Sequence, residues 1–157
     1  MKRRPRRAAT KRGRSPRATA SGPRTILRST LVAMTALARE ARQRARAPYS
    51  RFAVGAALKV RSGEIVTGCN VENASYGLSM CAERVAVFKA VSEGFTEFDA
   101  IVVVAGGKRP TPPCGACRQI LWELCGDILV RMVDVEGRSR STRLRALLPL
   151  AFDGGDL

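Results

Sequence analysis

The segment Phe98–Ala105 constrains the fold of this chain more than any other part of its sequence. It is a short, nearly continuous apolar run rich in Val and Ile, interrupted only by Asp99. Successive side chains of a strand point to opposite faces, so a strand that is apolar at consecutive positions must be covered on both sides. A bilayer-spanning helix needs roughly 20 apolar residues, which no run approaches. The segment therefore predicts a buried strand inside a layered domain.

The rest of the sequence alternates helical and strand patterns around this segment. Apolar residues recur at helical spacing in three stretches, from Thr25 to about Arg46, from Met80 to about Glu93, and from about Cys114 to Cys125. Strands are predicted at Phe52–Val60, Ile65–Cys69, Phe98–Ala105, Ile128–Val133 and, as an edge strand, Thr142–Leu148. This alternation predicts one layered α/β domain over residues 25–157, with a partly parallel sheet.

The net charge of +15 belongs mainly to an N-terminal tail. Residues 1–24 contain ten Lys and Arg and no acidic residue, which leaves 18 basic and 13 acidic residues, a net +5, for the remainder. With almost no large apolar residues, the tail is predicted to be disordered. Three interpretations remain for it: a silent extension, a weak attachment to nucleic acid or another polyanion, or an organellar transit peptide.

The chain has five cysteines and no histidine. An odd number of cysteines without an apolar export signal favours reduced thiols over a disulfide framework. We therefore expect a cytoplasmic protein whose thiols are free to bind metal.

Two cysteine-containing segments carry the most informative chemistry, Cys81-Ala82-Glu83 and Pro113-Cys114-Gly115-Ala116-Cys117. A C-x₂-C pair at a helix N-terminus turns both thiols to one side, and the helix dipole favours thiolate there. Cys81 opens another predicted helix, so three thiolates can converge on one ion. In isolation the C-x₂-C pair would suit structural zinc or a redox pair as well as a catalytic site. The combination of the two segments, each at a predicted helix start, predicts a catalytic zinc site.

Three protein ligands leave one tetrahedral position of zinc open for water, which is the arrangement of a catalytic site. The two other cysteines are weaker candidates for a fourth ligand, because Cys69 lies at a predicted strand end and Cys125 at the far end of a predicted helix. Bound zinc lowers the pKa of its water from about 15.7 to about 7, and Glu83 is near enough to take the proton. Arg84 and Arg118 are candidates to donate hydrogen bonds to thiolate sulfur, although either could be an exposed helix arginine.

The residues around these motifs resemble cytidine deaminase of the small, homotetrameric type. Five segments between about residue 25 and residue 153 carry the resemblance: APYSRFAVGAAL (47–58), GCNVENASY (68–76), CAER (81–84), PCGACRQ (113–119) and LLPLAF (147–152). The resemblance implies a three-layer α/β/α fold with a mixed five-stranded sheet. It also implies hydrolytic deamination of free cytidine and deoxycytidine to uridine and deoxyuridine, with release of ammonia, in pyrimidine salvage.

The same resemblance assigns roles to individual residues. Cys81, Cys114 and Cys117 would hold Zn²⁺, and Glu83 would shuttle protons while hydroxide attacks the pyrimidine at C4. The substrate-binding residues would be Phe52, stacked on the base, Asn70 and Glu72, bound to the ribose hydroxyls, and Ala82, Tyr76 and Phe152, with Phe152 lent by a neighbouring subunit. An aromatic face suits a flat base, and a carboxylate beside an amide can both accept from and donate to a hydroxyl.

Simpler interpretations remain for several of these residues, and rival functions remain for the chain. Phe52 and Phe152 could be packing residues, while Asn70 and Glu72 could be ordinary loop polar residues. The rival functions are deamination of cytosine in a polynucleotide, deamination of blasticidin S on the same fold, and a non-enzymatic zinc-stabilised protein that binds nucleic acid through its tail. A hydrogen-bonded ribose 3′-hydroxyl would leave no room for a following phosphate, which speaks against the first.

Overall fold

The computed structural model describes residues 25–157, so the predictions about residues 1–24 lie outside the described part of the chain. The helices are α1 (Arg28–Gln43), α2 (Ala82–Ser92) and α3 (Gly115–Cys125), with short 3₁₀ turns η1 (Tyr76–Leu78) and η2 (Leu144–Ala146). The strands are β1 (Val54–Val60), β2 (Ile65–Cys69), β3 (Phe98–Ala105), β4 (Leu129–Asp134) and β5 (Ser139–Arg143). Within residues 25–157, no helix is both long enough and apolar enough to span a bilayer.

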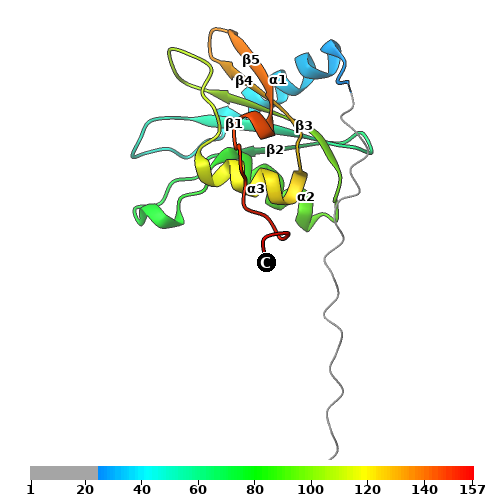
Figure 1. Ribbon diagram of the computed structural model, residues 1–157. Helices are drawn as coiled ribbons and strands as arrows, with labels where there is room; N and C mark the ends of the chain where they lie inside the picture. Colours follow the sequence, from blue (N-terminus) through cyan, green and yellow to red (C-terminus); the bar gives the residue numbers. More distant parts are fainter. Residues whose placement is uncertain (1–24) are drawn as a thin grey trace, which may run out of the picture.

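The domain has three layers, with α1 on one face of the sheet and α2 and α3 on the other (Figure 1). All eight residues of β3 are buried, Asp99 included, as its nearly continuous apolar run predicts. Alternate residues of β3 face opposite sides: Val102 belongs to the core beneath α1, whereas Ile101 belongs to the core beneath α2 and α3. The predicted three-layer α/β/α fold with a mixed five-stranded sheet is confirmed.

The order of the strands, β2-β1-β3-β4-β5, decides where the loops meet. β1 is antiparallel to both β2 and β3, so β2 and β3 end at the same edge of the sheet. The chain passes from β2 into α2 and from β3 into α3, which places the starts of both helices above that edge. Ligand sites of open α/β sheets form at such carboxyl ends.

The prediction of an edge strand at Thr142–Leu148 is wrong. The observed strand β5 is Ser139–Arg143, and the chain then turns through η2. Leu144 is fully buried, and the amide N–H groups of Leu147 and Leu148 both donate to its carbonyl oxygen. The leucines therefore pack in a turn, while the edge strand itself consists of Ser, Thr and Arg, which suits an unpaired edge in water.

Gly55 of β1 is required by the contact between the sheet and α1. A Cβ atom there would lie 2.1 Å from the carbonyl oxygen of Ala38 and 2.5 Å from the amide nitrogen of Arg42. We expect Gly55→Ala to lower the free energy of unfolding by about 3 kcal/mol, because backbone cannot yield as a side chain does. The measurement is the midpoint of denaturant unfolding.

Gly77→Ala is the matched control, because a Cβ atom at Gly77 meets no atom within 4 Å. Its free energy of unfolding should change by less than about 0.5 kcal/mol. Equal stability of the Gly55→Ala variant and the unmodified chain would contradict the close packing of α1 on β1.

Candidate active site

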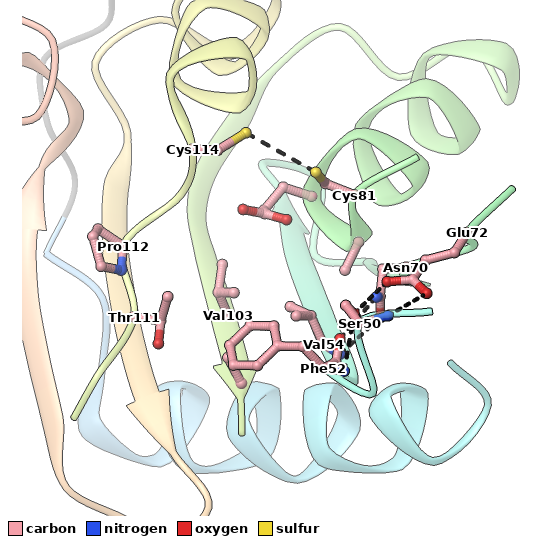
Figure 2. Close-up of a pocket in the computed structure, with 13 residues that line it drawn as sticks. Ser50, Phe52, Val54, Asn70, Glu72, Cys81, Val103, Thr111, Pro112 and Cys114 are labelled. Carbon is pink, nitrogen blue, oxygen red and sulfur yellow. Dashed lines mark hydrogen bonds between the residues drawn. The ribbon is translucent and has the colours of Figure 1, made fainter. Parts of the chain in front are cut away.

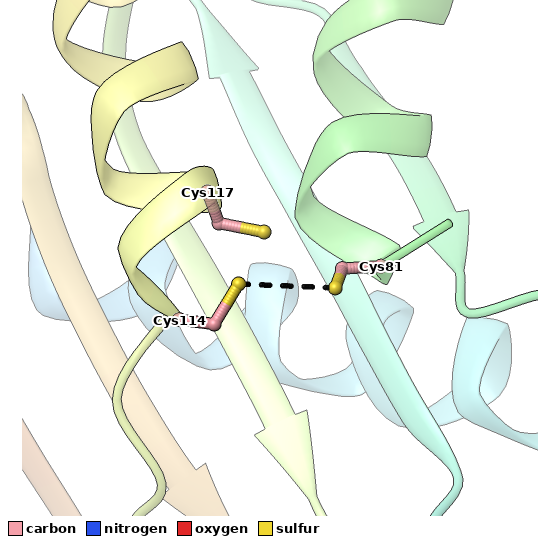
Figure 3. A group of neighbouring side chains, drawn as sticks. All are labelled: Cys81, Cys114 and Cys117. Atoms are coloured by element: carbon pink, nitrogen blue, oxygen red, sulfur yellow. Dashed lines mark hydrogen bonds between the residues drawn. The ribbon is translucent and has the colours of Figure 1, made fainter. Parts of the chain in front are cut away.

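Three cysteine thiols converge where α2 and α3 begin. Cys81 is the N-cap residue of α2, Cys114 is the N-cap residue of α3, and Cys117 lies in the first turn of α3. Their sulfur atoms lie within 4.8 Å of one another, with 4.0 Å between those of Cys81 and Cys114 (Figure 3). The predicted convergence from two helix starts is therefore present in the fold.

The spacing and protonation of these sulfurs fit a zinc ion. Tetrahedral Zn–S bonds of about 2.3 Å set sulfur atoms roughly 3.8 Å apart, close to the separation of Cys81 and Cys114. Hydrogen bonds from the Cys117 thiol and from Arg84 lower the pKa of Cys81 to about 5, whereas donation to Cys81 and burial raise the pKa of Cys117. Without a cation the Cys117 thiol stays neutral while it donates to the Cys81 thiolate, whereas a divalent cation would stabilise thiolates at all three positions.

The arginines that follow the cysteines behave differently from each other. Nη2 of Arg84 lies 3.8 Å from the sulfur of Cys81 and 3.2 Å from the carbonyl oxygen of Ser79, so it is placed to neutralise part of the thiolate charge. Arg118 instead donates to the carbonyl oxygens of Pro113 and Leu147, at 2.7 and 2.8 Å. Arg118 thus holds backbone, which leaves Arg84 as the arginine beside sulfur.

Glu83 lies in the first turn of α2 and is 5% exposed. Burial, together with the negative charge of Cys81, raises its pKa to about 7. A carboxyl group with such a pKa is present in both protonation states near neutral pH, so it can accept a proton and return it. The arrangement provides a proton-transfer group next to a candidate metal centre.

A cavity of about 400 Å³ opens beside the thiols (Figure 2). Seven of the sequence-predicted site residues line it, namely Phe52, Asn70, Glu72, Cys81, Ala82, Glu83 and Cys114. Its volume is that of a site for a small organic molecule. Tyr76 and Phe152 are not among the lining residues of this chain and are 77% and 58% exposed.

Sequence reasoning missed six residues that line the cavity: Ser50, Val54, Val103, Ala105, Thr111 and Pro112. Val103 and Ala105 form the end of β3, and Thr111 and Pro112 belong to the Gly- and Pro-rich loop that follows it. The position of that loop, directly after a buried strand, is the signal by which it could have been found.

Asn70 and Glu72 hold the segment that carries Phe52. The side-chain amide of Asn70 accepts a hydrogen bond from the amide N–H of Val54 at 2.8 Å and donates to the carbonyl oxygen of Phe52 at 2.9 Å. Glu72 accepts from the amide N–H of Tyr49 at 2.9 Å and from both the amide and the hydroxyl of Ser50. Each side chain retains further hydrogen-bonding capacity toward a ligand.

The fold and the site together define a three-layer α/β domain with a candidate thiolate metal centre. The family described as "Cytidine and deoxycytidylate deaminase zinc-binding region" matches residues 28–132 of this chain. A cytidine deaminase from Halalkalibacterium halodurans is 52% identical over 119 residues, which cover 75% of this chain and 90% of that protein. A blasticidin-S deaminase from Bacillus cereus is 32% identical over 107 residues, which cover 63% and 76% of the two chains.

Solved structures agree with these sequence similarities. The crystal structure of cytidine deaminase from Burkholderia pseudomallei matches with a TM-score of 0.75 and 48% identity, covering 77% of this chain and 98% of that one. The chain belongs to the cytidine deaminase family.

The lowered pKa of Cys81 makes this thiol reactive in metal-free protein. At pH 6.5 we expect iodoacetamide to modify Cys81 at least roughly tenfold faster than Cys125, because Cys81 is then a thiolate whereas burial raises the pKa of Cys125. Peptide mass spectrometry over a pH series measures both rates, and added zinc should protect Cys81. A Cys81 rate that falls away below pH 8, as for an ordinary thiol, would contradict the prediction.

Proposed function

We propose that this chain hydrolytically deaminates free cytidine and deoxycytidine to uridine and deoxyuridine, with release of ammonia, as a cytoplasmic enzyme of pyrimidine salvage. The observation that carries the proposal is a buried carboxyl group, Glu83, in the same cavity wall as Cys81 and Cys114. Relatives named cytidine deaminase match most of the chain, which supports the same reaction. A reducing compartment would keep the thiols available for metal.

Each residue of the site has a chemical task in this reaction. Cys81, Cys114 and Cys117 would hold zinc, which when bound supplies a Lewis acid that lowers the pKa of water. Glu83 would take one proton of the attacking water and deliver it to the ring nitrogen N3, which keeps it in uridine. It would then carry the second proton, from the hydroxyl formed at C4, to the amino group, which leaves as ammonia. Arg84 would hold the Cys81 sulfur in place and offset its charge.

The cavity favours a free nucleoside over a nucleotide or polynucleotide. The described residues that line it include two carboxylates, Glu72 and Glu83, and no Lys or Arg that could pair with a phosphate. Phe52 would stack on the base, Asn70 and Glu72 would bind the ribose hydroxyls, and Ala82 would line the base pocket. This charge pattern opposes the polynucleotide alternative that the basic tail suggests.

We extend the proposal to a homotetramer in which Phe152 closes the pocket of a neighbouring subunit. Phe152 is 58% exposed, and Tyr76 and Leu78 of η1 are 77% and 70% exposed, an amount of exposed apolar surface that favours burial against other subunits. The backbone carbonyl oxygen of Phe152 accepts a hydrogen bond of 2.7 Å from Gln119, which fixes the segment that presents its ring.

Glu83→Gln is the most direct test of the reaction. The amide keeps the shape of the side chain but cannot accept a proton, so kcat for cytidine should fall by about 10² to 10⁴, with zinc content and fold unchanged. Loss of absorbance on conversion of cytidine to uridine measures turnover, and metal analysis before and after chelation measures zinc.

The same assay separates the rival functions. A cytidine-containing oligonucleotide and blasticidin S serve as alternative substrates for the unmodified enzyme. Deamination of either one in place of cytidine would reverse the assignment, and unchanged turnover in Glu83→Gln would remove Glu83 from the mechanism.

Subunit sharing of Phe152 is tested by mixing two impaired variants. Phe152→Ala lacks the ring and Glu83→Gln lacks the proton carrier, so each alone should be slow. Subunit exchange between them should restore part of the activity, because some mixed sites regain Glu83 from one chain and Phe152 from the other. Activity equal to the sum of the separate variants after confirmed exchange would show that Phe152 acts within its own chain or not at all.

A further inference from the structure

The loop between β3 and α3, residues 106–113, forms part of the cavity wall without regular secondary structure of its own. Thr111 and Pro112 line the cavity across from Phe52 (Figure 2), and the loop leads directly into Cys114. A Cβ atom on Gly107 would lie 3.9 Å from the ring of Phe52, so the loop runs along that ring. Because it has no ladder of hydrogen bonds, its shape depends on contacts from elsewhere.

Three hydrogen bonds tie the loop backbone to other elements. At its start the amide N–H of Gly106 donates to the carbonyl oxygen of Ala53 at 3.4 Å. At its end Nε of Arg118 donates to the carbonyl oxygen of Pro113 at 2.7 Å. In the middle Nη2 of Arg138 donates to the carbonyl oxygen of Lys108 at 2.8 Å. The last contact comes from the β4–β5 turn, 30 residues further along the chain.

Arg138 is itself held rigidly. Its Nε donates to Asp134 at 2.6 Å and its backbone N–H donates to the other carboxylate oxygen at 2.9 Å. Asp134 is fully buried at the carboxyl end of β4, where it pairs with Ala105, the last residue of β3 before the loop. Arg39 of α1 donates to the carbonyl oxygens of Asp134 and Val135, which fixes the same turn from the opposite side.

We propose that Arg138, anchored by the buried carboxylate of Asp134, is a positioning residue that sets the β3–α3 loop against the substrate pocket. The proposal rests on the proposed function for its kinetic consequence, whereas its structural consequence is independent of it. The planar guanidinium bonds Asp134 through one nitrogen and Lys108 through another. The single ammonium of a lysine cannot span both partners in this way.

This difference gives a matched set of variants. Arg138→Ala removes both contacts together with an ion pair of 3.0 Å to Glu136, while Arg138→Lys keeps the charge beside Asp134 and Glu136 and loses the contact to the loop. Arg140→Ala is the control, because Arg140 is an exposed arginine of β5 whose side chain makes no hydrogen bond or ion pair within residues 25–157. Order parameters of the backbone amides of residues 107–109 and 111, measured by NMR relaxation, report the motion of the loop. The kinetics of cytidine deamination are measured on the same zinc-loaded full chain.

We expect both Arg138 variants to lower the amide order parameters of residues 107–109 and 111 and to raise KM for cytidine by roughly three- to tenfold, the effect of about one lost hydrogen bond. Since Glu83 and the thiols are held by α2 and α3, kcat should change by less than about twofold and zinc content should not change. Arg140→Ala should match the unmodified chain in every measurement.

Three outcomes would overturn the proposal. Unchanged order parameters in both Arg138 variants show that Arg138 does not hold the loop. Lower order parameters with an unchanged KM show that the loop does not shape the pocket. Equal effects in Arg140→Ala show that only net charge matters. If Arg138→Ala fails to fold, Arg138→Lys decides. If the unmodified chain does not turn over cytidine, the proposed function fails, and the order parameters alone decide whether Arg138 holds the loop.

Discussion

The convergence of three thiols at two helix starts is the constraint on which the rest of the site depends. Cys81 and Cys114 occupy N-cap positions, so their sulfur atoms meet only if α2 and α3 begin side by side. The sheet provides this arrangement, because β2 and β3 both run antiparallel to β1 and end at one edge. Strand β3 is buried on both faces of the sheet, so the layers on both sides hold its end in place. The candidate metal centre is therefore a consequence of the strand order and not of any local motif alone.

Part of the wall of the pocket next to the thiols is formed by two segments without regular secondary structure, beside residues of β1, β3 and α2. Asn70 and Glu72 tie down residues 49–54, in which Arg51 adopts a φ of 55°, a left-handed conformation that costs free energy in a residue with a side chain. The hydrogen bonds of the surrounding framework offset that cost and aim Phe52 at the cavity. Residues 106–113 are held in the same manner by arginines from other elements. Hydrogen bonds from side chains to the loop backbone thus stabilise these two segments, which lack the backbone hydrogen bonds that stabilise a strand.

The apolar pattern of the sequence predicts helices and strands correctly where it follows the burial of their side chains. The predicted bounds of β3 match the observed ones because its nearly continuous apolar run marks a strand covered on both faces. The predicted bounds of α2 and α3 match to within about two residues because apolar residues recur there at helical spacing. The prediction of a strand at Thr142–Leu148 is wrong, because the leucines there pack in a turn. The observed strand, Ser139–Arg143, has no apolar face by which the sequence pattern could locate it. An edge strand whose residues face water carries no hydrophobic alternation, so pattern analysis cannot locate it.

The sequence alone determined the class of the fold, the three cysteines, the neighbouring glutamate and the family resemblance, because these depend on residue identity and short spacings. Only the tertiary structure decided that Asn70 and Glu72 hold the Phe52 segment, that Arg118 binds backbone whereas Arg84 lies beside sulfur, and that Thr111 and Pro112 complete the wall. These facts join residues distant in the chain, and a hydrogen bond between distant residues leaves no periodic signal. Packing in the folded protein decides which of several possible partners a side chain contacts. The neighbouring residues in the sequence do not determine that choice.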